Sequence, residues 1–176
     1  GIWAEMYDTE ISSCLITDCF ADGVHMTGPS QNITVENCLI IGCGDDGIAA
    51  TSTPAGKSVV SGFFIRNNTI LAAYGGRGIM VSGTAECVIE NNYIADIFRN
   101  PAVLVWDERV YNTMSVYNTE IRNNIVSRSI RNTGLHRGSI TVHSNRLGYY
   151  TDADVYDNES YHNKFSYGLY TADFKD

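Results

Sequence analysis

Two acidic turn sequences and one basic turn sequence carry the residues best suited to chemistry. They are Ala21-Asp22-Gly23-Val24, Gly44-Asp45-Asp46-Gly47-Ile48 and Gly75-Gly76-Arg77-Gly78-Ile79. When two carboxyl groups lie close together, their repulsion raises the pKa of one of them. A protonated and an ionised carboxyl group side by side can serve as general acid and general base. These turns therefore predict acid–base catalysis, provided that the fold brings them together.

The three turns occupy equivalent places in an internal repeat. Six segments that begin with an aliphatic residue start 24, 30, 24, 32 and 34 residues apart, at Ile11, Val35, Ile65, Ile89, Ile121 and Val155. A second apolar segment follows each one: Gly23–Met26, Gly47–Ala50, Gly78–Val81, Ala102–Val105, Ser139–Val142 and Gly168–Thr171. In the first three repeats the offset is nearly constant, so the strands keep their register while one loop absorbs insertions.

Short β-branched runs punctuated by Gly and Asn recur along the chain, and helical periodicity is absent. This pattern predicts an all-β, right-handed parallel β-helix of about six coils. Ankyrin-type and leucine-rich arrays have similar periods, but they do not tolerate so much Asn and so little Leu. We expect Asn67, Asn91 and Asn123 to form a side-chain ladder at a turn. Residues 1–176 form one β-helix domain, which we expect to be a section of a longer solenoid, incomplete at both ends.

Four of the five cysteines fall at matching repeat positions, Cys14 with Cys38 and Cys19 with Cys43. Neighbouring coils lie about 4.8 Å apart, a distance that permits either disulfides or a ladder of buried free thiols. Both possibilities stay open at this point. Cys87 has no cysteine or histidine partners at zinc-site spacing, so no zinc site is expected.

The net charge of −8 excludes nucleic acid and anionic membrane surfaces as partners, because both require clustered Lys and Arg. No apolar run is long enough to cross a membrane. Clustered aspartates could also bind calcium, but Arg77 beside them would repel the ion. We therefore expect neither a metal nor a cofactor. The oligomeric state stays open.

Counting back from the first residue of each second segment's strand, Val24, Ile48 and Ile79, predicts which side chains stack. Asp22, Asp46 and Arg77 share one position, and Asp45 lies beside them. A single Asp-Gly pair is commonly a structural turn. Two in register, with an arginine on the next coil, favour a functional site. Gly23, Gly47 and Gly78 follow directly, and we expect them to leave the backbone open to a ligand.

Phe20-Ala21-Asp22-Gly23-Val24 and Gly44-Asp45-Asp46-Gly47-Ile48-Ala49 resemble the paired aspartate motifs of β-helical glycoside hydrolases. The A-D-G and G-D-D-G-x-A pair is similar to that of the α-1,3-glucanase and mycodextranase group, family 87. A more distant resemblance is to the polygalacturonases of family 28, with N-T-D-G, D-D, G-H-G and R-I-K motifs. The resemblance implies an inverting glycosidase in which Asp45 protonates the leaving oxygen. Asp22 and Asp46 would activate water, and inversion needs roughly 6.5–9.5 Å between acid and base.

Two departures from the polygalacturonase motifs concern the substrate. Gly76-Arg77-Gly78 stands where their histidine motif is expected, and Pro101-Ala102-Val103-Leu104 stands where R-I-K holds a uronate. Without that Arg and Lys pair, and with a net negative charge, we expect a neutral glucan as the polysaccharide substrate. Secretion is then expected from the substrate class alone, since no signal sequence is visible.

Further candidates for substrate binding are Arg77, His25, Tyr74, Phe98 and Trp106. Asp107 and Glu108 could supply another carboxylate, although a surface position is the simpler expectation. The insertion at 132–137 is long enough to form a cleft wall. Two other classes use the same scaffold: a polysaccharide lyase or epimerase, and a non-catalytic carbohydrate-binding or tailspike-like β-helix.

Overall fold

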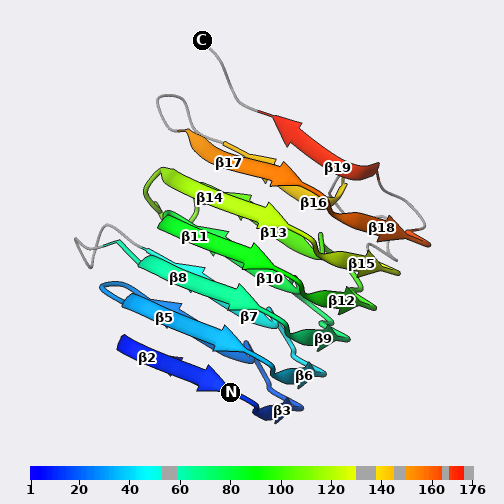
Figure 1. Cartoon of the computed structure of the whole chain (residues 1–176), viewed down its shortest axis with the longest axis horizontal. Coiled ribbons are helices and arrows are strands. Elements are labelled where there is room, and N and C mark those ends of the chain that lie inside the picture. Colours follow the sequence, from blue (N-terminus) through cyan, green and yellow to red (C-terminus); the bar gives the residue numbers. More distant parts are fainter. Residues whose placement is uncertain (53–58, 130–137, 145–149, 164–166, 173–176) are drawn as a thin grey trace.

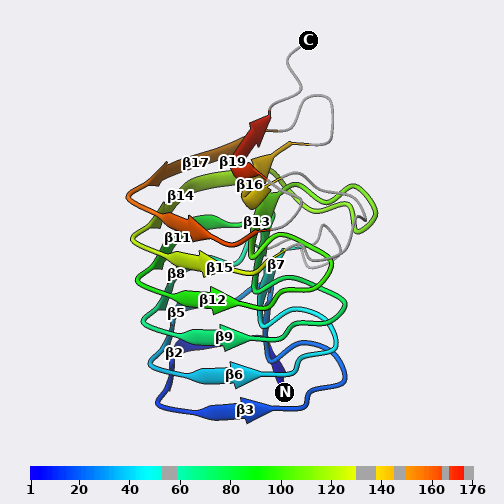
Figure 2. The same cartoon turned by 90° about the vertical axis from the view of Figure 1, so that its right-hand side faces the viewer.

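The computed structural model describes residues 1–52, 59–129, 138–144, 150–163 and 167–172, the last range by its backbone alone. Within these ranges the chain forms nineteen strands and no helix. Six successive coils of three strands each follow the short first strand and stack along one axis (Figures 1 and 2). Every strand pairs in parallel with the equivalent strands of the neighbouring coils, as in β4 with β7. The predicted parallel β-helix is confirmed.

The strands form three sheets, each built from one strand per coil. The first sheet has the order β1 (Ile2–Ala4), β4 (Val24–Thr27), β7 (Ile48–Thr51), β10 (Ile79–Ser82), β13 (Val103–Trp106), β16 (Gly138–His143) and β19 (Tyr167–Ala172). The second contains β2 (Tyr7–Ser12), β5 (Gln31–Glu36), β8 (Ser61–Arg66), β11 (Ala85–Glu90), β14 (Val116–Arg122) and β17 (Thr151–Tyr156). The third contains β3 (Leu15–Thr17), β6 (Leu39–Ile41), β9 (Thr69–Leu71), β12 (Tyr93–Ala95), β15 (Ile125–Ser127) and β18 (Glu159–Tyr161).

The register of the sheets follows the repeat. Along the second sheet, Ile11 pairs with Val35, Val35 with Ile65, and the series continues through Ile89, Ile121 and Val155. Along the first sheet, Val24 pairs with Ile48, then Ile79, Val103 and Ile140. These aliphatic side chains point inward and form one continuous core. Burying apolar surface in this stack is the main source of stability.

Each first apolar segment spans a corner between two sheets, so a coil has three strands where the sequence shows two segments. The residue at the corner adopts a left-handed conformation in every coil; the six are Ser13, Asn37, Asn67, Asn91, Asn123 and Asp157. Asn tolerates this conformation better than most residues. The corner explains why Asn recurs there.

The asparagine ladder is real but lies one residue later than predicted. Asn67, Asn91 and Asn123 are exposed, because the left-handed turn directs them outward, and the expectation for them was wrong. The ladder consists of Asn68, Asn92 and Asn124, which are buried, and Asn158, which is half-buried. Nδ2 of Asn92, for example, donates to Oδ1 of Asn124 over 2.9 Å and to the carbonyl of Ile65 over 2.9 Å.

The cysteines are free thiols. Cys38 occupies the ladder position of the second coil, and its backbone N–H donates to Oδ1 of Asn68 over 3.0 Å. Cys38, Cys19, Cys43 and Cys87 are buried, while Cys14 is half-buried. Burial raises the pKa of Cys43 to about 12 and that of Cys87 well above its usual range. The buried-thiol interpretation is confirmed and the disulfide alternative is wrong.

The outward face of the second sheet pairs acidic with basic side chains along the helix axis. Nε of Arg66 lies 2.6 Å from Oε2 of Glu36, and Nε of Arg122 lies 3.0 Å from Oε2 of Glu90. Such a ladder fixes register at the surface. Among the described residues there is no helix with the length and hydropathy to span a membrane.

Candidate active site

The turns that lead from the third sheet into the first sheet place the predicted residues together. Asp22, Asp46 and Arg77 each precede a strand of the first sheet by two residues, and those strands, β4, β7 and β10, are hydrogen-bonded neighbours. Asp45 precedes Asp46 on the second coil. The stacking expected from the repeat is therefore what the structure contains.

The glycines after these residues serve the packing of the coils and not the approach of a ligand. A Cβ on Gly47 would lie 2.5 Å from Cγ2 of Ile70 and 2.6 Å from the carbonyl oxygen of Gly78. Gly23 is equally confined, 2.8 Å from Cγ2 of Ile40. Because the obstruction comes from the core and the next coil, the ligand-access interpretation of these glycines was wrong.

Gly76 has a different role, because it makes room for the carboxylates themselves. A Cβ there would collide with Oδ1 of Asp45 and with Oδ1 of Asp46. No sequence pattern distinguished Gly76 from the neighbouring glycines. Its position shows that the aspartates are packed against the turn of the third coil.

Backbone N–H groups of the following coil compensate the stacked aspartates. Oδ1 of Asp22 accepts a hydrogen bond from the N–H of Asp46 over 2.8 Å. Oδ1 of Asp46 accepts one from the N–H of Arg77 over 2.6 Å. Hydrogen bonds donated to a carboxylate stabilise its charged form. The stacked carboxylates of Asp22 and Asp46 thus stabilise the turns in addition to forming a candidate catalytic cluster.

The three aspartates form a compact cluster in which one oxygen of each lies within 4.8 Å of the others. Asp46 is buried, Asp22 is half-buried and Asp45 is exposed. A wide separation of acid and base, as inversion would need, requires Asp45 to point away from the other two, and the cluster does not have that geometry. Among the described residues this trio is also the set that could hold a cation. Arg77, with Nη1 3.7 Å from Oδ1 of Asp46, opposes a cation there.

Burial dominates the electrostatics of the cluster. The pKa of Asp46 is raised to about 7; burial is the main cause, Arg77 acts against it, and the charges of Asp45 and Asp22 add smaller upward contributions. The pKa of Asp45 is also raised, first by burial and then by Asp22, while Arg77 and His25 lower it. Like-charge repulsion, which the sequence suggested as the cause, is the smaller contribution.

His25 and Arg77 flank the cluster. Nδ1 of His25 lies 2.5 Å from Oδ2 of Asp22, so His25 holds that carboxylate in place. The guanidinium of Arg77 lies 5.6 Å from the ring centroid of Trp106, which supports it by a cation–π contact. Trp106 also packs against the ring of His143, with ring centroids 5.3 Å apart. These contacts indicate that Trp106 holds the side chain of Arg77 in place.

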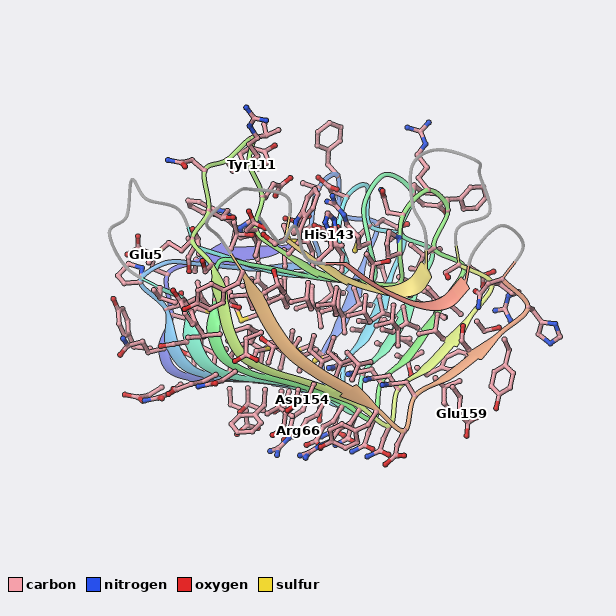
Figure 3. The ribbon with its side chains drawn as sticks, turned by 90° about the horizontal axis from the view of Figure 1, so that it is seen from above. Glu5, Arg66, Tyr111, His143, Asp154 and Glu159 are labelled. Atoms are coloured by element: carbon pink, nitrogen blue, oxygen red, sulfur yellow. The ribbon has the colours of Figure 1, made fainter. Side chains whose placement is uncertain are left out.

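A pocket of about 470 Å³ opens above the cluster. Its floor is the outward face of the first sheet, and its lining is Asp22, His25, Thr27, Asp45, Asp46, Thr51, Arg77, Met80, Glu108 and Tyr111. Figure 3 shows Tyr111 and His143 on this side of the molecule and Arg66 and Asp154 on the opposite side. The volume falls within the range of roughly 300–1,000 Å³ typical of ligand sites.

The loop after β13 supplies residues that sequence reasoning missed or misjudged. Glu108 and Asp107 are buried, with 7% and 0% of their surface exposed, so the expectation of surface charges was wrong. Tyr111 is exposed and lines the pocket. Thr51 and Met80, on the sheet floor, were also missed. The sequence signal that could have found Thr51 and Met80 is strand alternation, which places them on the same outward face of the first sheet as His25.

A second hollow of about 330 Å³ adjoins the first, and Asp22 and His25 line both. Trp3 and Phe20 contribute exposed aromatic rings to it. Tyr74 and Phe98 are exposed and pair with each other, ring centroids 6.1 Å apart, outside the lining of either hollow. The insertion at 132–137 lies outside the described residues.

Residues 3–157 match the family described as alpha-1,3-glucanase catalytic domain D2. The chain belongs to this family. The resemblance to the family 87 glucanases is thereby confirmed. No curated protein sequence matches the chain.

Solved structures share the fold of this family member. A complex of the catalytic domain of a GH87 alpha-1,3-glucanase variant with tetrasaccharides has a TM-score of 0.66 and 18% identity, covering 88% of this chain and 34% of that one. The Dettilon tailspike protein (TM-score 0.55, 14% identity) is covered to 38%, with 96% of this chain matched. The mannuronan C-5 epimerase AlgE4 A-module of Azotobacter vinelandii (0.55, 14%) is covered to 56%, with 97% matched. The chain spans about a third of the glucanase structure.

Proposed function

We propose that this protein hydrolyses glycosidic bonds of a neutral polysaccharide, most simply an α-1,3-glucan. The observation that carries the proposal is the cluster of Asp22, Asp45 and Asp46, which lines the first hollow and whose member Asp22 also lines the hollow beside it. A glycosidic bond joins two sugar units, so the groups that cleave it must lie where the binding sites of the two units meet. Membership of the glucanase family supports the same activity.

Asp45 is the proton donor in this proposal. It is the exposed member of the trio, so it can reach a glycosidic oxygen, and its pKa is raised. Asp46 has the higher pKa but is buried with 3% of its surface exposed. Access to the leaving oxygen decides the assignment, because a general acid must come within hydrogen-bond distance of the atom it protonates.

Asp22 and Asp46 activate the attacking water. Each is held by a backbone hydrogen bond, and His25 and Arg77 respectively add a second contact. These contacts fix the carboxylates without the participation of the substrate. Fixed acceptors that need no reorganisation during the reaction are the most effective at orienting a nucleophile.

Charge supports a neutral substrate over a uronate. The pocket lining contains four carboxyl groups, those of Asp22, Asp45, Asp46 and Glu108, against Arg77 and His25. Arg77, the candidate counter-charge for a uronate, already contacts Asp46 and Trp106. An anionic sugar would meet net repulsion at close range.

The test is release of reducing ends from α-1,3-glucan, other neutral α- and β-glucans, and polygalacturonate. Asp45→Asn, which keeps the shape of the side chain, is assayed alongside. We expect release from a neutral glucan, with a loss of about 10²–10⁴-fold in the variant. Release from polygalacturonate would overturn the neutral-substrate assignment. No release from any polymer by the folded protein would favour a binding role like that of a tailspike.

The epimerase and lyase alternative makes a different prediction with the same samples. Cleavage by a lyase gives unsaturated products that absorb in the ultraviolet, and an epimerase changes the sugar without releasing ends. Either result on a uronate polymer would replace hydrolysis as the function.

A further inference from the structure

The loop after β13 brings a buried carboxylate to the pocket on the side facing the aspartates. Glu108 follows Trp106, the last residue of β13, by two positions. Its backbone N–H donates to Oγ1 of Thr113 over 2.6 Å, and the N–H of Thr113 donates back to its carbonyl over 3.2 Å. Ser82 on β10 donates to the same Thr113 hydroxyl over 2.9 Å. The loop is thereby fixed to the sheet, and Glu108 with it.

Glu108 is buried, yet among the described residues Oε2 has no hydrogen-bond partner. An unpaired buried acceptor costs about 1–3 kcal/mol, and more when charged. Folding alone gives no reason to keep a carboxylate in this state, since an apolar residue would pack there at lower cost. Its position in the pocket lining suggests a ligand as the missing partner.

Two other lining residues carry unpaired buried polar atoms. Nε of Arg77 and Oγ1 of Thr51 are buried and have no partner in the part of the chain that the structure describes. Three residues of the pocket lining thus each carry a buried polar atom in need of a partner: an acceptor at Glu108, a donor at Arg77 and a hydroxyl at Thr51. Neighbouring hydroxyl groups on a sugar ring, each both donor and acceptor, match this set.

We propose that Glu108, Arg77 and Thr51 form a sugar-binding subsite next to the aspartate cluster, in which Glu108 accepts a hydrogen bond from a hydroxyl of a neutral hexose. The subsite rests on the proposed function for its ligand class. It extends the substrate path along the helix axis, from the first coil at Asp22 to the fourth at Glu108. Tyr111, exposed on the same loop, provides a ring that covers the sugar.

Binding to inactive protein tests the subsite independently of turnover. Neutral gluco-oligosaccharides of four units, α-1,3-linked and from the other glucans of the panel, are titrated calorimetrically into the Asp45→Asn variant. Adding Glu108→Ala is expected to weaken the Kd at least tenfold, since a hydrogen bond to a charged group is lost. Adding Glu108→Gln, which keeps the volume, is expected to weaken it several-fold. Glu10→Ala, on the exposed outward face of β2, is the matched control and leaves the Kd unchanged.

The outcomes separate the subsite from the function. A Kd within twofold of the background in Glu108→Ala overturns the subsite, even if the wild-type protein hydrolyses the glucan. Glu108-dependent binding with no hydrolysis by wild-type protein overturns the function and keeps the subsite. Absence of binding to every oligosaccharide overturns the subsite too. Circular dichroism verifies folding, and the Glu108→Gln variant decides the matter if Glu108→Ala does not fold.

Discussion

Oδ1 of Asp22 accepts a hydrogen bond from the backbone N–H of Asp46 at 2.8 Å, so one candidate catalytic carboxylate holds the backbone that carries another. Asp46 repeats the relationship with the N–H of Arg77 on the next coil. The same contact that stabilises the turn also fixes the carboxylate. An alanine variant of Asp22 or Asp46 would therefore remove a structural hydrogen bond together with the catalytic group. Asparagine variants, which keep the shape of the side chain, are the ones that test catalysis alone.

Gly76→Ala is expected to lower kcat at least tenfold while the protein stays folded. The new methyl group would collide with the carboxylate oxygens of Asp45 and Asp46, which must move. A displacement of about 1 Å in a catalytic group can cost as much as 10²-fold in rate. Steady-state kinetics and thermal unfolding measure the two effects. Gly62→Ala is the control, because Gly62 has a φ of +63° and is the second residue of β8, so that variant loses stability without losing kcat.

Asp46→Asn is expected to stabilise the protein in a pH-dependent manner. The folded-state pKa of Asp46 is about 7, raised by burial from an ordinary value of 3.8. Below pH 3.8 the carboxyl is neutral in both states, whereas stability falls as pH rises toward 7 because the fold disfavours the charge. Asparagine avoids this cost and keeps an acceptor for the N–H of Arg77. The Tm difference between variant and wild type should be near zero at pH 4 and several degrees at pH 8. A Tm difference that does not change with pH would contradict the raised pKa of Asp46.

The register of the coils was predictable from the sequence because it depends on local alternation and a constant offset. Ile11, Val35 and Ile65 stack as the repeat requires. The asparagine ladder was misplaced by one residue because a left-handed residue such as Asn91 reverses which neighbour faces inward. Glu108 was misjudged because its burial depends on how an irregular loop folds back over the sheet. No periodic signal reports such a contact.

Asn92→Ala is expected to lower the free energy of unfolding by at least about 2 kcal/mol, because it leaves buried hydrogen-bonding groups unpaired. Asn92 donates to Ile65 and Asn124 and accepts two hydrogen bonds from Asn68. Asn91→Gly is the matched control, since Asn91 is exposed and its φ of +55° suits glycine. Urea unfolding of the pair should show a change only in the first. An equal loss of unfolding free energy in both variants would show that Asn92 is not the ladder residue.

Removal of divalent cations is expected to leave hydrolysis unchanged. Arg77 lies 3.7 Å from Asp46 and supplies the positive charge that a cation would otherwise provide. Incubation with EDTA, followed by the reducing-end assay with and without added calcium, measures the effect. A loss of activity that calcium restores would assign the aspartate trio to a metal site instead.

The first product of hydrolysis is expected to have the anomeric configuration opposite to that of the substrate. Double displacement requires a carboxylate oxygen free to bond the anomeric carbon, but Oδ1 of Asp22 accepts from Asp46 and Oδ2 lies against His25. Asp46 is buried and its Oδ1 accepts from Arg77. In the proposed mechanism water held by these carboxylates is the nucleophile, and a single displacement would invert the centre. The nearest oxygens of the trio lie within 4.8 Å of one another. Carboxyl groups are usually roughly 6.5–9.5 Å apart in inverting enzymes and roughly 5–5.5 Å apart in retaining ones, so the short separation favours retention, the hydrogen bonds favour inversion, and the anomer of the first product decides between them. Proton NMR in the first minutes of reaction, before mutarotation, identifies the anomer; retention of configuration would show that one of the aspartates attacks the sugar directly.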